Sequence, residues 1–303
     1  MEKNLGYTKP LFIMAFDHRA SFAKNILGLQ GEPTAEQTDQ VRDYKYLIYQ
    51  GLLKAIEQGI PKEQAAVLVD EFSGDRVLKE AKQQELTIIL TTEKSGKDEF
   101  SFEYGTAFGE HIEKYAPTFI KALVRYNPDG DMAGNNRSAE QLKILSDYSH
   151  IHGYKFLIEP LIPATPVQLA EVGGGKHRYD AEIRPDLTIR MIKELQDAGV
   201  NPDIWKIEGM DETVSYEEVV AQARSGGRQN VSCVILGRGE SSAGVEKWIN
   251  AGKPVSGIVG FAIGRTIFAD ALTALREGKI SRDEAITKIC ENYTHFYKMF
   301  TSK

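Results

Sequence analysis

Short apolar runs alternate with amphipathic segments along the whole chain. Most of the runs are continuously apolar and rich in β-branched residues, which is typical of parallel strands covered on both faces. Eight runs are the expected strands: Leu11–Phe16, Ala66–Val69, Leu86–Thr91, Thr118–Val124, Lys155–Ile158, Asp203–Ile207, Val231–Leu236 and Gly257–Ala262. Helical periodicity separates them, most clearly in Gln37–Glu57, Ser138–His150, Arg184–Ala198, Ser215–Ser225 and Ala243–Ala251. Eight strand–helix repeats predict a TIM (β/α)8 barrel of the α/β class, with an open doubly wound sheet as the alternative.

We expect residues 1–303 to form one barrel domain, because barrels often reach this length and no linker divides the chain. Apolar residues at helical spacing within Ser281–Phe300 predict an additional C-terminal helix that covers the barrel wall or a subunit contact. Gly173–Gly175 is expected in an active-site loop after the fifth strand, although a flexible joint is the alternative. Ser215 and Glu218 have the spacing of a capping box, which predicts a helix N-terminus at Ser215.

Composition excludes several classes of protein. The net charge of −6 argues against a general nucleic-acid binder. The longest N-terminal apolar run, Leu11–Phe16, is too short for a signal core or a membrane span, so we expect a cytoplasmic protein that does not enter membranes.

Cys233 and Cys290 match no metal-binding spacing and are expected to be reduced thiols. No Gly-x-Gly-x-x-Gly or Walker-type loop is present, so we expect no cofactor.

Lys206 is the most informative single residue, because it lies near the C-terminal end of an otherwise apolar strand. Catalytic groups of TIM barrels lie at those strand ends. A lysine amine that loses its proton there can attack a carbonyl carbon, which indicates a Schiff-base enzyme and an aldolase acting on a phosphorylated sugar. The structural alternative is an internal ion pair between Lys206 and Glu208, which share one face of the strand.

Three further residues complete the expected catalytic set. Lys121 and Arg125 share one face of the fourth strand, and if that face points inward Lys121 approaches Lys206. A neighbouring cation and burial both favour a neutral amine. Glu159 follows the fifth strand and is a candidate proton shuttle, or else a carboxylate paired with a lysine. Asp17 is either a second acid/base group or a partner that orients a lysine.

Glycine-flanked arginines after the seventh and eighth strands predict an anion site. Barrel enzymes often bind phosphate there through backbone amides and a helix N-terminus. The expected substrate-binding set comprises Arg19, Arg125, Gly237, Arg238, Gly239, Gly264 and Arg265. The alternative for Arg238 and Arg265 is ordinary surface charge.

The histidines do not form a metal site in the sequence. A metal-dependent aldolase needs histidine and carboxylate ligands on several strand ends, and only His18 is well placed. We therefore expect no catalytic metal.

Several segments resemble the class I aldolase-like domain that is fused behind 5-dehydro-2-deoxygluconokinase in myo-inositol breakdown. The matching segments are Leu11–Arg19, Ile162–Thr165, Asp203–Gly209, Ile235–Glu240 and Gly260–Arg265. This resemblance implies cleavage of 5-dehydro-2-deoxygluconate 6-phosphate to dihydroxyacetone phosphate and malonate semialdehyde.

The chain also resembles, more distantly, the tagatose-1,6-bisphosphate aldolases. That resemblance implies Lys206 as the Schiff-base lysine, Glu159 as the proton shuttle and Lys121 as the second active-site lysine. Glu93–Gly96 is similar to their Glu-Lys-Thr-Gly segment, whereas Gly237–Gly239 departs from their Ser-Ala-Gly type of loop and leaves the anionic group open.

The sequence therefore predicts a class I aldolase whose partner is a small phosphorylated, or alternatively sulfonated, sugar. The alternatives are a tagatose-1,6-bisphosphate aldolase, a 6-deoxy-6-sulfofructose aldolase or transaldolase, and a sugar-phosphate sensor that binds without catalysis. A barrel with a purely structural or partner-binding role would leave the strand-end charges unexplained. We expect a homo-oligomer.

Overall fold

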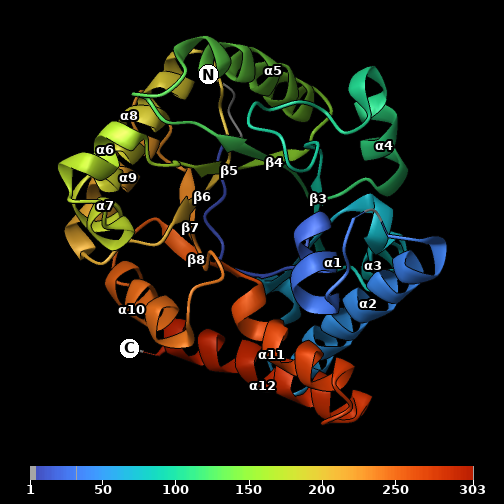
Figure 1. Cartoon of the computed structure of the whole chain (residues 1–303). Helices are drawn as coiled ribbons and strands as arrows, with labels where there is room; N and C mark the ends of the chain where they lie inside the picture. The colour runs from blue at the N-terminus through green and yellow to red at the C-terminus, as the bar shows by residue number, and fades with distance from the viewer. Residues whose placement is uncertain (1–4, 32, 303) are drawn as a thin grey trace.

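Eight parallel strands form a closed barrel in chain order, and helices surround it (Figure 1). The computed structural model describes residues 5–31 and 33–302. The strands are β1 (Leu11–Ala15), β2 (Ala65–Val69), β3 (Thr87–Thr91), β4 (Phe119–Arg125), β5 (Lys155–Leu161), β6 (Ile204–Glu208), β7 (Ser232–Leu236) and β8 (Ile258–Ile263). Because β8 pairs with β1, the sheet has no open edge. The predicted TIM barrel is confirmed, and the open doubly wound sheet is wrong.

Helices follow the strands and complete the outer layer. They are α1 (Ala20–Leu27), α2 (Ala35–Glu57), α3 (Glu71–Gln83), α4 (Phe108–Tyr115), α5 (Met132–Ile151), α6 (Pro166–Glu171), α7 (Lys176–Glu182), α8 (Arg184–Asp197), α9 (Thr213–Ala223), α10 (Ser242–Gly252), α11 (Arg265–Arg276) and α12 (Arg282–Thr301). Two single 3₁₀ turns lie at Lys62–Gln64 and Gly105–Ala107. The additional C-terminal helix is therefore confirmed as α12, which begins after Ser281 in a capping box with Glu284.

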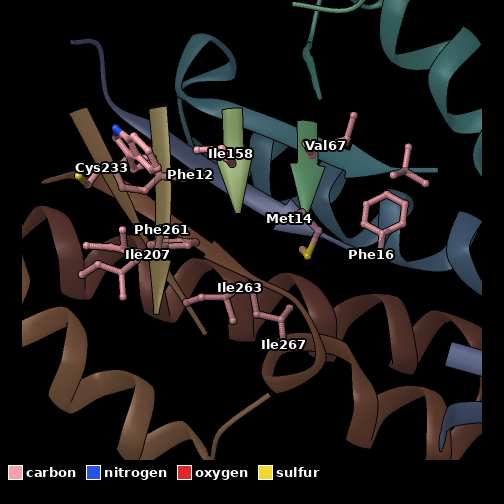
Figure 2. Close-up of a cluster of buried hydrophobic side chains, with 14 of the residues drawn as sticks. Phe12, Met14, Phe16, Val67, Ile158, Ile207, Cys233, Phe261, Ile263 and Ile267 are labelled. Atoms are coloured by element: carbon pink, nitrogen blue, oxygen red, sulfur yellow. The ribbon is translucent and has the colours of Figure 1, made fainter. Parts of the chain in front are cut away.

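Strand side chains alternate between two apolar layers, because successive residues of a strand point to opposite faces. One layer fills the barrel interior: Leu11, Ile13, Ala15, Ala66, Leu68, Ile89, Phe119, Leu157, Ile204, Val234 and Ala262. The other layer packs against the helices, and Figure 2 shows part of it together with Ile267 of α11: Phe12, Met14, Phe16, Val67, Ile158, Ile207, Cys233, Phe261 and Ile263. Burial on both faces explains why the strands read as continuous apolar runs.

The alternation also determines where the polar strand ends point. Phe119 faces the barrel interior, so Lys121 and Arg125 continue the same face toward the C-terminal end of β4. In the same way Glu159 continues the inner face from Leu157 on β5. The inner face is thus apolar along the barrel and charged at its C-terminal mouth.

Strands β4, β5, β6 and β8 extend further at this end than the sequence predicts, and β5 extends furthest. β5 runs through Glu159 to Leu161 rather than ending at Ile158, because its last residues pair with Leu123–Arg125 of β4. Pro160 lies within this extension, and its missing N–H did not prevent pairing. Glu159 is therefore a strand residue, paired with Leu123 of β4, whereas the pairing of β5 with β6 ends at Ile158.

Tertiary contacts overrode the local sequence pattern at some helix ends. The predicted cap at Ser215 is wrong: α9 begins at Thr213, after Glu212, which makes no side-chain cap. Contacts of Tyr216 with the Met210 N–H and of Trp248 with Asp211 hold the preceding turn. α5 begins six residues before the predicted Ser138, after Asp131, whose carboxylate accepts from the Ala133 N–H.

Both cysteines are buried and unpaired. Burial raises the pKa of the Cys233 thiol to about 12, so it stays protonated and inert at neutral pH. Within residues 5–31 and 33–302, no helix has both the length and the apolar composition that crossing a bilayer requires.

Replacing Tyr293 with phenylalanine tests how α12 is held on the barrel. The buried Tyr293 hydroxyl donates to the Phe12 carbonyl of β1 at 2.8 Å. Its loss leaves that carbonyl with one fewer partner, so Tyr293→Phe should lower the free energy of unfolding by about 1–3 kcal/mol in urea titrations. Tyr297→Phe is the matched control, because the Tyr297 hydroxyl bonds Gln64 at 3.2 Å in a partly exposed position. Equal effects in the two variants would contradict this role.

Candidate active site

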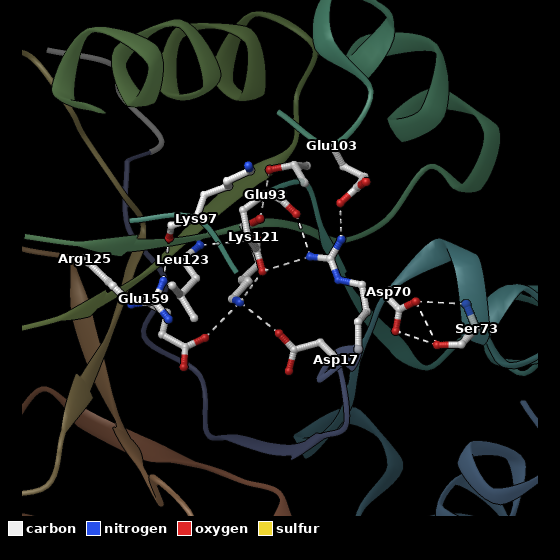
Figure 3. Close-up of polar contacts among 12 residues, drawn as sticks. Asp17, Asp70, Ser73, Glu93, Lys97, Glu103, Lys121, Leu123, Arg125 and Glu159 are labelled. Carbon is white, nitrogen blue, oxygen red and sulfur yellow. Dashed lines mark hydrogen bonds and ion pairs between the residues drawn. The ribbon is translucent and has the colours of Figure 1, made fainter. Parts of the chain in front are cut away.

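The four expected catalytic side chains meet at the C-terminal mouth of the barrel, and Figure 3 shows three of them, Asp17, Lys121 and Glu159. Lys121 is fully buried, and its Nζ lies 2.8 Å from Asp17 Oδ2, 2.8 Å from Glu93 Oε1 and 2.9 Å from Glu159 Oε2. Lys206 Nζ lies 2.9 Å from the same Glu159 oxygen. Glu159 Oε2 therefore contacts the amines of two lysines, Lys121 on β4 and Lys206 on β6, the strands on either side of β5.

The partner of Lys206 differs from the structural alternative that the sequence raised. Glu208 does not pair with Lys206, because its Oε1 lies 3.0 Å from Arg238 Nε and its Oε2 accepts from the Ile162 N–H at 3.0 Å. Lys206 borders the cavity at the mouth, whereas Lys121 lies beneath it with no exposed surface. A small molecule in the cavity reaches the amine of Lys206 first.

The charges of this cluster stabilise one another. Burial opposes ionisation of Asp17 and Glu159, but the Lys121 and Lys206 ammonium groups hold the pKa of each carboxyl below its usual range. Burial also opposes the charge on Lys121, yet the carboxylates of Asp17, Glu159 and Glu93 raise its pKa well above the usual value. The three carboxylates thus favour the charged form of Lys121, which makes its amine a poorer nucleophile than that of Lys206, which contacts one carboxylate.

Glu93 is a member of the cluster that the sequence prediction did not include. It follows β3 on the inner face, two residues after Thr91, and alternation alone could have identified it. Besides Lys121, its carboxylate accepts from the Leu123 N–H at 3.3 Å. Burial raises the pKa of Glu93, against the opposing charges of Lys121 and Arg19. Glu93 is therefore the carboxyl of the cluster that takes up a proton most readily.

A cavity of about 320 Å³ opens above the cluster. Its lining includes residues from the strand ends and from the loop after β3: Asp17, His18, Arg19, Glu93, Lys94, Ser95, Gly96, Lys97, Leu123, Arg125, Glu159, Leu161, Lys206, Leu236, Arg238, Gly239, Gly264 and Arg265. Every predicted site residue except Lys121 and Gly237 is among them. Gly237 lies just outside, where a β-carbon would pack 3.2 Å from Ile263.

His18 lies in the cavity wall as a neutral ring. Burial lowers its pKa to about 4, and the nearby cations Arg265 and Lys206 act in the same direction against Asp17. Its buried Nδ1 has no hydrogen-bond partner among the described residues. The ring can therefore donate or accept one hydrogen bond to a bound molecule without changing the net charge of the site.

The four predicted arginines all reach the cavity but have different partners. Arg19 forms ion pairs with Glu103 and Glu93, and Arg238 with Glu208 and Asp180. Asp180, on α7, carried no recognisable signal in the sequence. It also pairs with Arg184 of α8 at 2.9 Å, and its pair with Arg238 joins α7 to the loop after β7.

Arg125 and Arg265 bond instead to backbone carbonyls. Arg125 Nη1 donates to the Lys97 carbonyl at 2.6 Å, and Arg265 Nη2 donates to the Arg238 carbonyl at 2.8 Å. Gly239 approaches Arg265 closely, and its positive φ favours glycine. A β-carbon on Gly239, which has a φ of +72°, would lie 2.4 Å from the guanidinium carbon of Arg265.

The described residues contain no group of three histidine, cysteine, aspartate or glutamate side chains arranged to hold a metal ion. The three carboxylates at the mouth enclose the Lys121 ammonium instead.

The chain belongs to the family described as "Uncharacterized protein conserved in bacteria (DUF2090)", which matches residues 3–303. No protein with a curated description matches it. Among solved structures, Cgl0159 from Corynebacterium glutamicum is similar with a TM-score of 0.57 and 17% identity, over 97% of this chain and 88% of that one.

Two aldolase structures are also similar to this chain. A Schiff base forming fructose-1,6-bisphosphate aldolase has a TM-score of 0.56 and 13% identity, over 95% of this chain and 94% of that one. An archaeal fructose 1,6-bisphosphate aldolase has a TM-score of 0.57 and 14% identity, over 96% and 94%. At these identities the likeness establishes the shared barrel fold.

Removing the central cation should destabilise the protein in a pH-dependent way. Lys121→Met leaves the buried Asp17 carboxylate without an ion-pair partner among the described residues and removes one of the two cations around Glu93 and Glu159, which costs about 3–5 kcal/mol of unfolding free energy at pH 7. In the parent protein, the lowered pKa values of Asp17 and Glu159 contribute stability above the unfolded value near 4, and this contribution is lost as the pH falls. In the variant these carboxyls protonate more easily when folded, so the deficit should shrink between pH 7 and pH 4.

Urea titrations at several pH values measure this difference. Lys193→Met is the control, because Lys193 forms an exposed pair with Asp197 and its loss should change little at any pH. A deficit that stays constant with pH would contradict a carboxylate origin.

Proposed function

We propose that this protein is a class I aldolase that cleaves a phosphorylated keto sugar or keto sugar acid through a Schiff base on Lys206. The observation that carries the proposal is the contact of 2.9 Å between Lys206 Nζ and Glu159 Oε2, at the floor of the cavity. In this proposal Lys206 is the nucleophilic amine and Glu159 is the proton acceptor, and both line the cavity that would hold the substrate. The similarity of the barrel to a Schiff base forming aldolase supports the same chemistry.

In the first half of the proposed reaction, Glu159 accepts a proton from Lys206, and the neutral amine attacks the substrate ketone carbon. The resulting carbinolamine loses its hydroxyl as water when Glu159 returns a proton to it, which leaves a positively charged iminium. Lys121 keeps Glu159 oriented toward Lys206, because both amines share its Oε2 atom. Lys121 also stays charged throughout, so it offsets the carboxylates without competing as a nucleophile.

In the second half, the iminium accepts the electron pair of the bond beyond the adjacent carbon. A base removes the proton of the hydroxyl on the departing carbon, which leaves as an aldehyde, and an enamine remains on Lys206. Protonation of the enamine carbon and hydrolysis by water release the ketone product and restore the amine. Asp17 and Glu159 are the carboxylates we propose for these proton transfers, since both lie at the cavity.

We propose that Arg265, with the backbone around Gly239 and Gly264, binds the substrate phosphate. The finer proposal for the substrate is 5-dehydro-2-deoxygluconate 6-phosphate, giving dihydroxyacetone phosphate and malonate semialdehyde. It rests on the sequence resemblance to the kinase-fused aldolase-like domain. Release of malonate semialdehyde from this compound by the purified protein tests it directly, with tagatose 1,6-bisphosphate and 6-deoxy-6-sulfofructose as competing substrates.

Borohydride trapping should identify Lys206 as the nucleophile. Reduction in the presence of dihydroxyacetone phosphate should inactivate the protein and add the reduced ketone to the Lys206 peptide, as read by peptide mass spectrometry. Lys206→Ala should lose both activity and labelling, and Lys206→Arg should not restore them, because arginine stays protonated.

Lys121→Met separates the two lysines in this experiment. The variant should turn over slowly, yet its Lys206 peptide should still carry the label. A label on Lys121 in the parent protein would refute the assignment of the nucleophile and keep the reaction class. Absence of label from every ketose phosphate would favour a sugar-phosphate sensor.

Glu159→Gln should slow turnover without weakening the binding of anions in the cavity. Glutamine keeps the shape of the side chain but cannot shuttle a proton, so kcat should fall by about 10²–10⁴-fold. Steady-state kinetics measure this loss, and binding of inorganic phosphate should stay unchanged as the control. Near-normal kcat would transfer the proton-shuttle role to Asp17.

A further inference from the structure

The loop after β7 contains a tight turn, Gly237–Glu240, with an unusual backbone. The Glu240 N–H donates to the Gly237 carbonyl at 3.0 Å, which closes the turn. Its two central residues both have positive φ, +54° at Arg238 and +72° at Gly239, as in a type I′ turn. Glycine, asparagine and aspartate are the usual residues at these positions. A left-handed arginine is strained, so its surroundings must stabilise that conformation.

Two carboxylates hold the Arg238 side chain. Its Nε lies 3.0 Å from Glu208 Oε1, and its Nη1 donates to both carboxylate oxygens of Asp180 at 3.0 Å. Glu208 belongs to β6 and Asp180 to α7, so the side chain joins three separate segments of the chain. These pairs stabilise the strained backbone that carries the side chain. They also offset its charge, so Arg238 is poorly suited to bind a substrate anion directly.

The left-handed turn presents two backbone carbonyls to the start of α11. Arg265 Nη2 donates to the Arg238 carbonyl at 2.8 Å, and the Thr266 hydroxyl donates to the Glu240 carbonyl at 2.8 Å. Arg265 lines the cavity, and its buried Nε has no acceptor among the described residues, so the guanidinium keeps a donor for a ligand. If Arg238 left the left-handed region, its carbonyl would turn away from Arg265.

We infer that Arg238 is a positioning residue for the anion site rather than a ligand of the anion. Its side-chain ion pairs stabilise the left-handed turn, and the carbonyl of the turn holds the Arg265 guanidinium at the cavity. This inference rests on the proposed role of Arg265 in binding the substrate phosphate. It predicts that, among variants without the charge, anion binding follows the ease with which residue 238 adopts a left-handed backbone.

Two uncharged amides at this position separate the backbone from the charge. Arg238→Asn and Arg238→Gln remove the same charge and the same ion pairs, but asparagine followed by glycine is a preferred type I′ pair and glutamine is not. Asp180 keeps its pair with Arg184 in both variants. Glu208 still accepts from the Ile162 N–H, so both variants should fold.

Calorimetric or ³¹P NMR titration with inorganic phosphate measures the anion site without catalysis. The parent protein should bind phosphate, and Arg265→Gln should lose that binding. Arg238→Asn should bind phosphate roughly 5- to 30-fold more tightly than Arg238→Gln, the factor that corresponds to the cost of a left-handed backbone for an ordinary side chain. No binding by the parent protein, unchanged binding in Arg265→Gln, or equal affinities of the two amide variants would each overturn the inference.

Glu85 offers a matched control, because it has a similar left-handed backbone at the other end of the barrel. Its φ is +55°, its side chain is exposed, and it lies between α3 and β3. Glu85→Asn and Glu85→Gln should bind phosphate as tightly as the parent protein. A difference between them as large as that at Arg238 would overturn the inference.

A double variant tests whether Arg238 acts through Arg265. In the Arg265→Gln background, asparagine and glutamine at position 238 should give the same residual phosphate binding. A difference that persists in this background would show that Arg238 affects the anion by another route, and would overturn the inference.

Borohydride labelling of Lys206 separates this inference from the proposed function. Labelling together with equal phosphate affinities of the two amide variants would refute the positioning role and leave the Schiff-base chemistry intact. Tighter phosphate binding by Arg238→Asn, without labelling by any ketose phosphate, would refute the Schiff base and leave the positioning of Arg265 in place.

Discussion

The ion cluster around Lys121 is the interaction on which the rest of the site depends. A single buried ammonium holds three carboxylates, from the segments after β1 and β3 and from β5, so it fixes the mutual position of strand ends that lie far apart in the sequence. Burying any of these charges alone would lower the stability of the folded protein. The cluster avoids this penalty because every member has a partner of opposite charge. Lys206 joins this arrangement through Glu159 rather than through a partner of its own.

One oxygen of Glu159 contacts the amines of both Lys121 and Lys206, but the two lysines have different surroundings and different proposed roles. Lys121 contacts three carboxylates and is fixed as a cation, whereas Lys206 contacts one and borders the cavity. Two lysines that look equivalent in the sequence, each on an apolar strand, therefore differ in the number of anions around them. That difference is a property of the closed barrel, in which β1, β4 and β5 bring their ends to one point.

The sequence was sufficient to predict the barrel and much of the site geometry, because both follow from periodicity. Continuous apolar runs predicted the strands, and the alternation within β4 and β6 put Lys121 with Arg125 on one strand face and Lys206 with Glu208 on another, but only the closed barrel shows that the face of Lys121 points inward. The sequence was less informative about which charged side chains pair with one another. The sequence could not show that Glu208 meets Arg238, or that Asp180 on α7 neutralises the same arginine, since these contacts join segments with no fixed spacing. The start of α9 was likewise decided by contacts of Tyr216 and Trp248 rather than by the capping pattern.

The extension of β5 through Glu159 to Leu161 has a consequence for how relatives of this chain can diverge. Within a strand, insertion or deletion of one residue turns every following side chain to the opposite face. A change of length between Lys155 and Glu159 would therefore move the carboxylate out of the barrel, however conservative the inserted residue. The loops after β3 and β5 escape this constraint, because the strands on either side are anchored independently. Diversification of this scaffold is thus expected to proceed by substitution within strands and by variation of length in the loops above them.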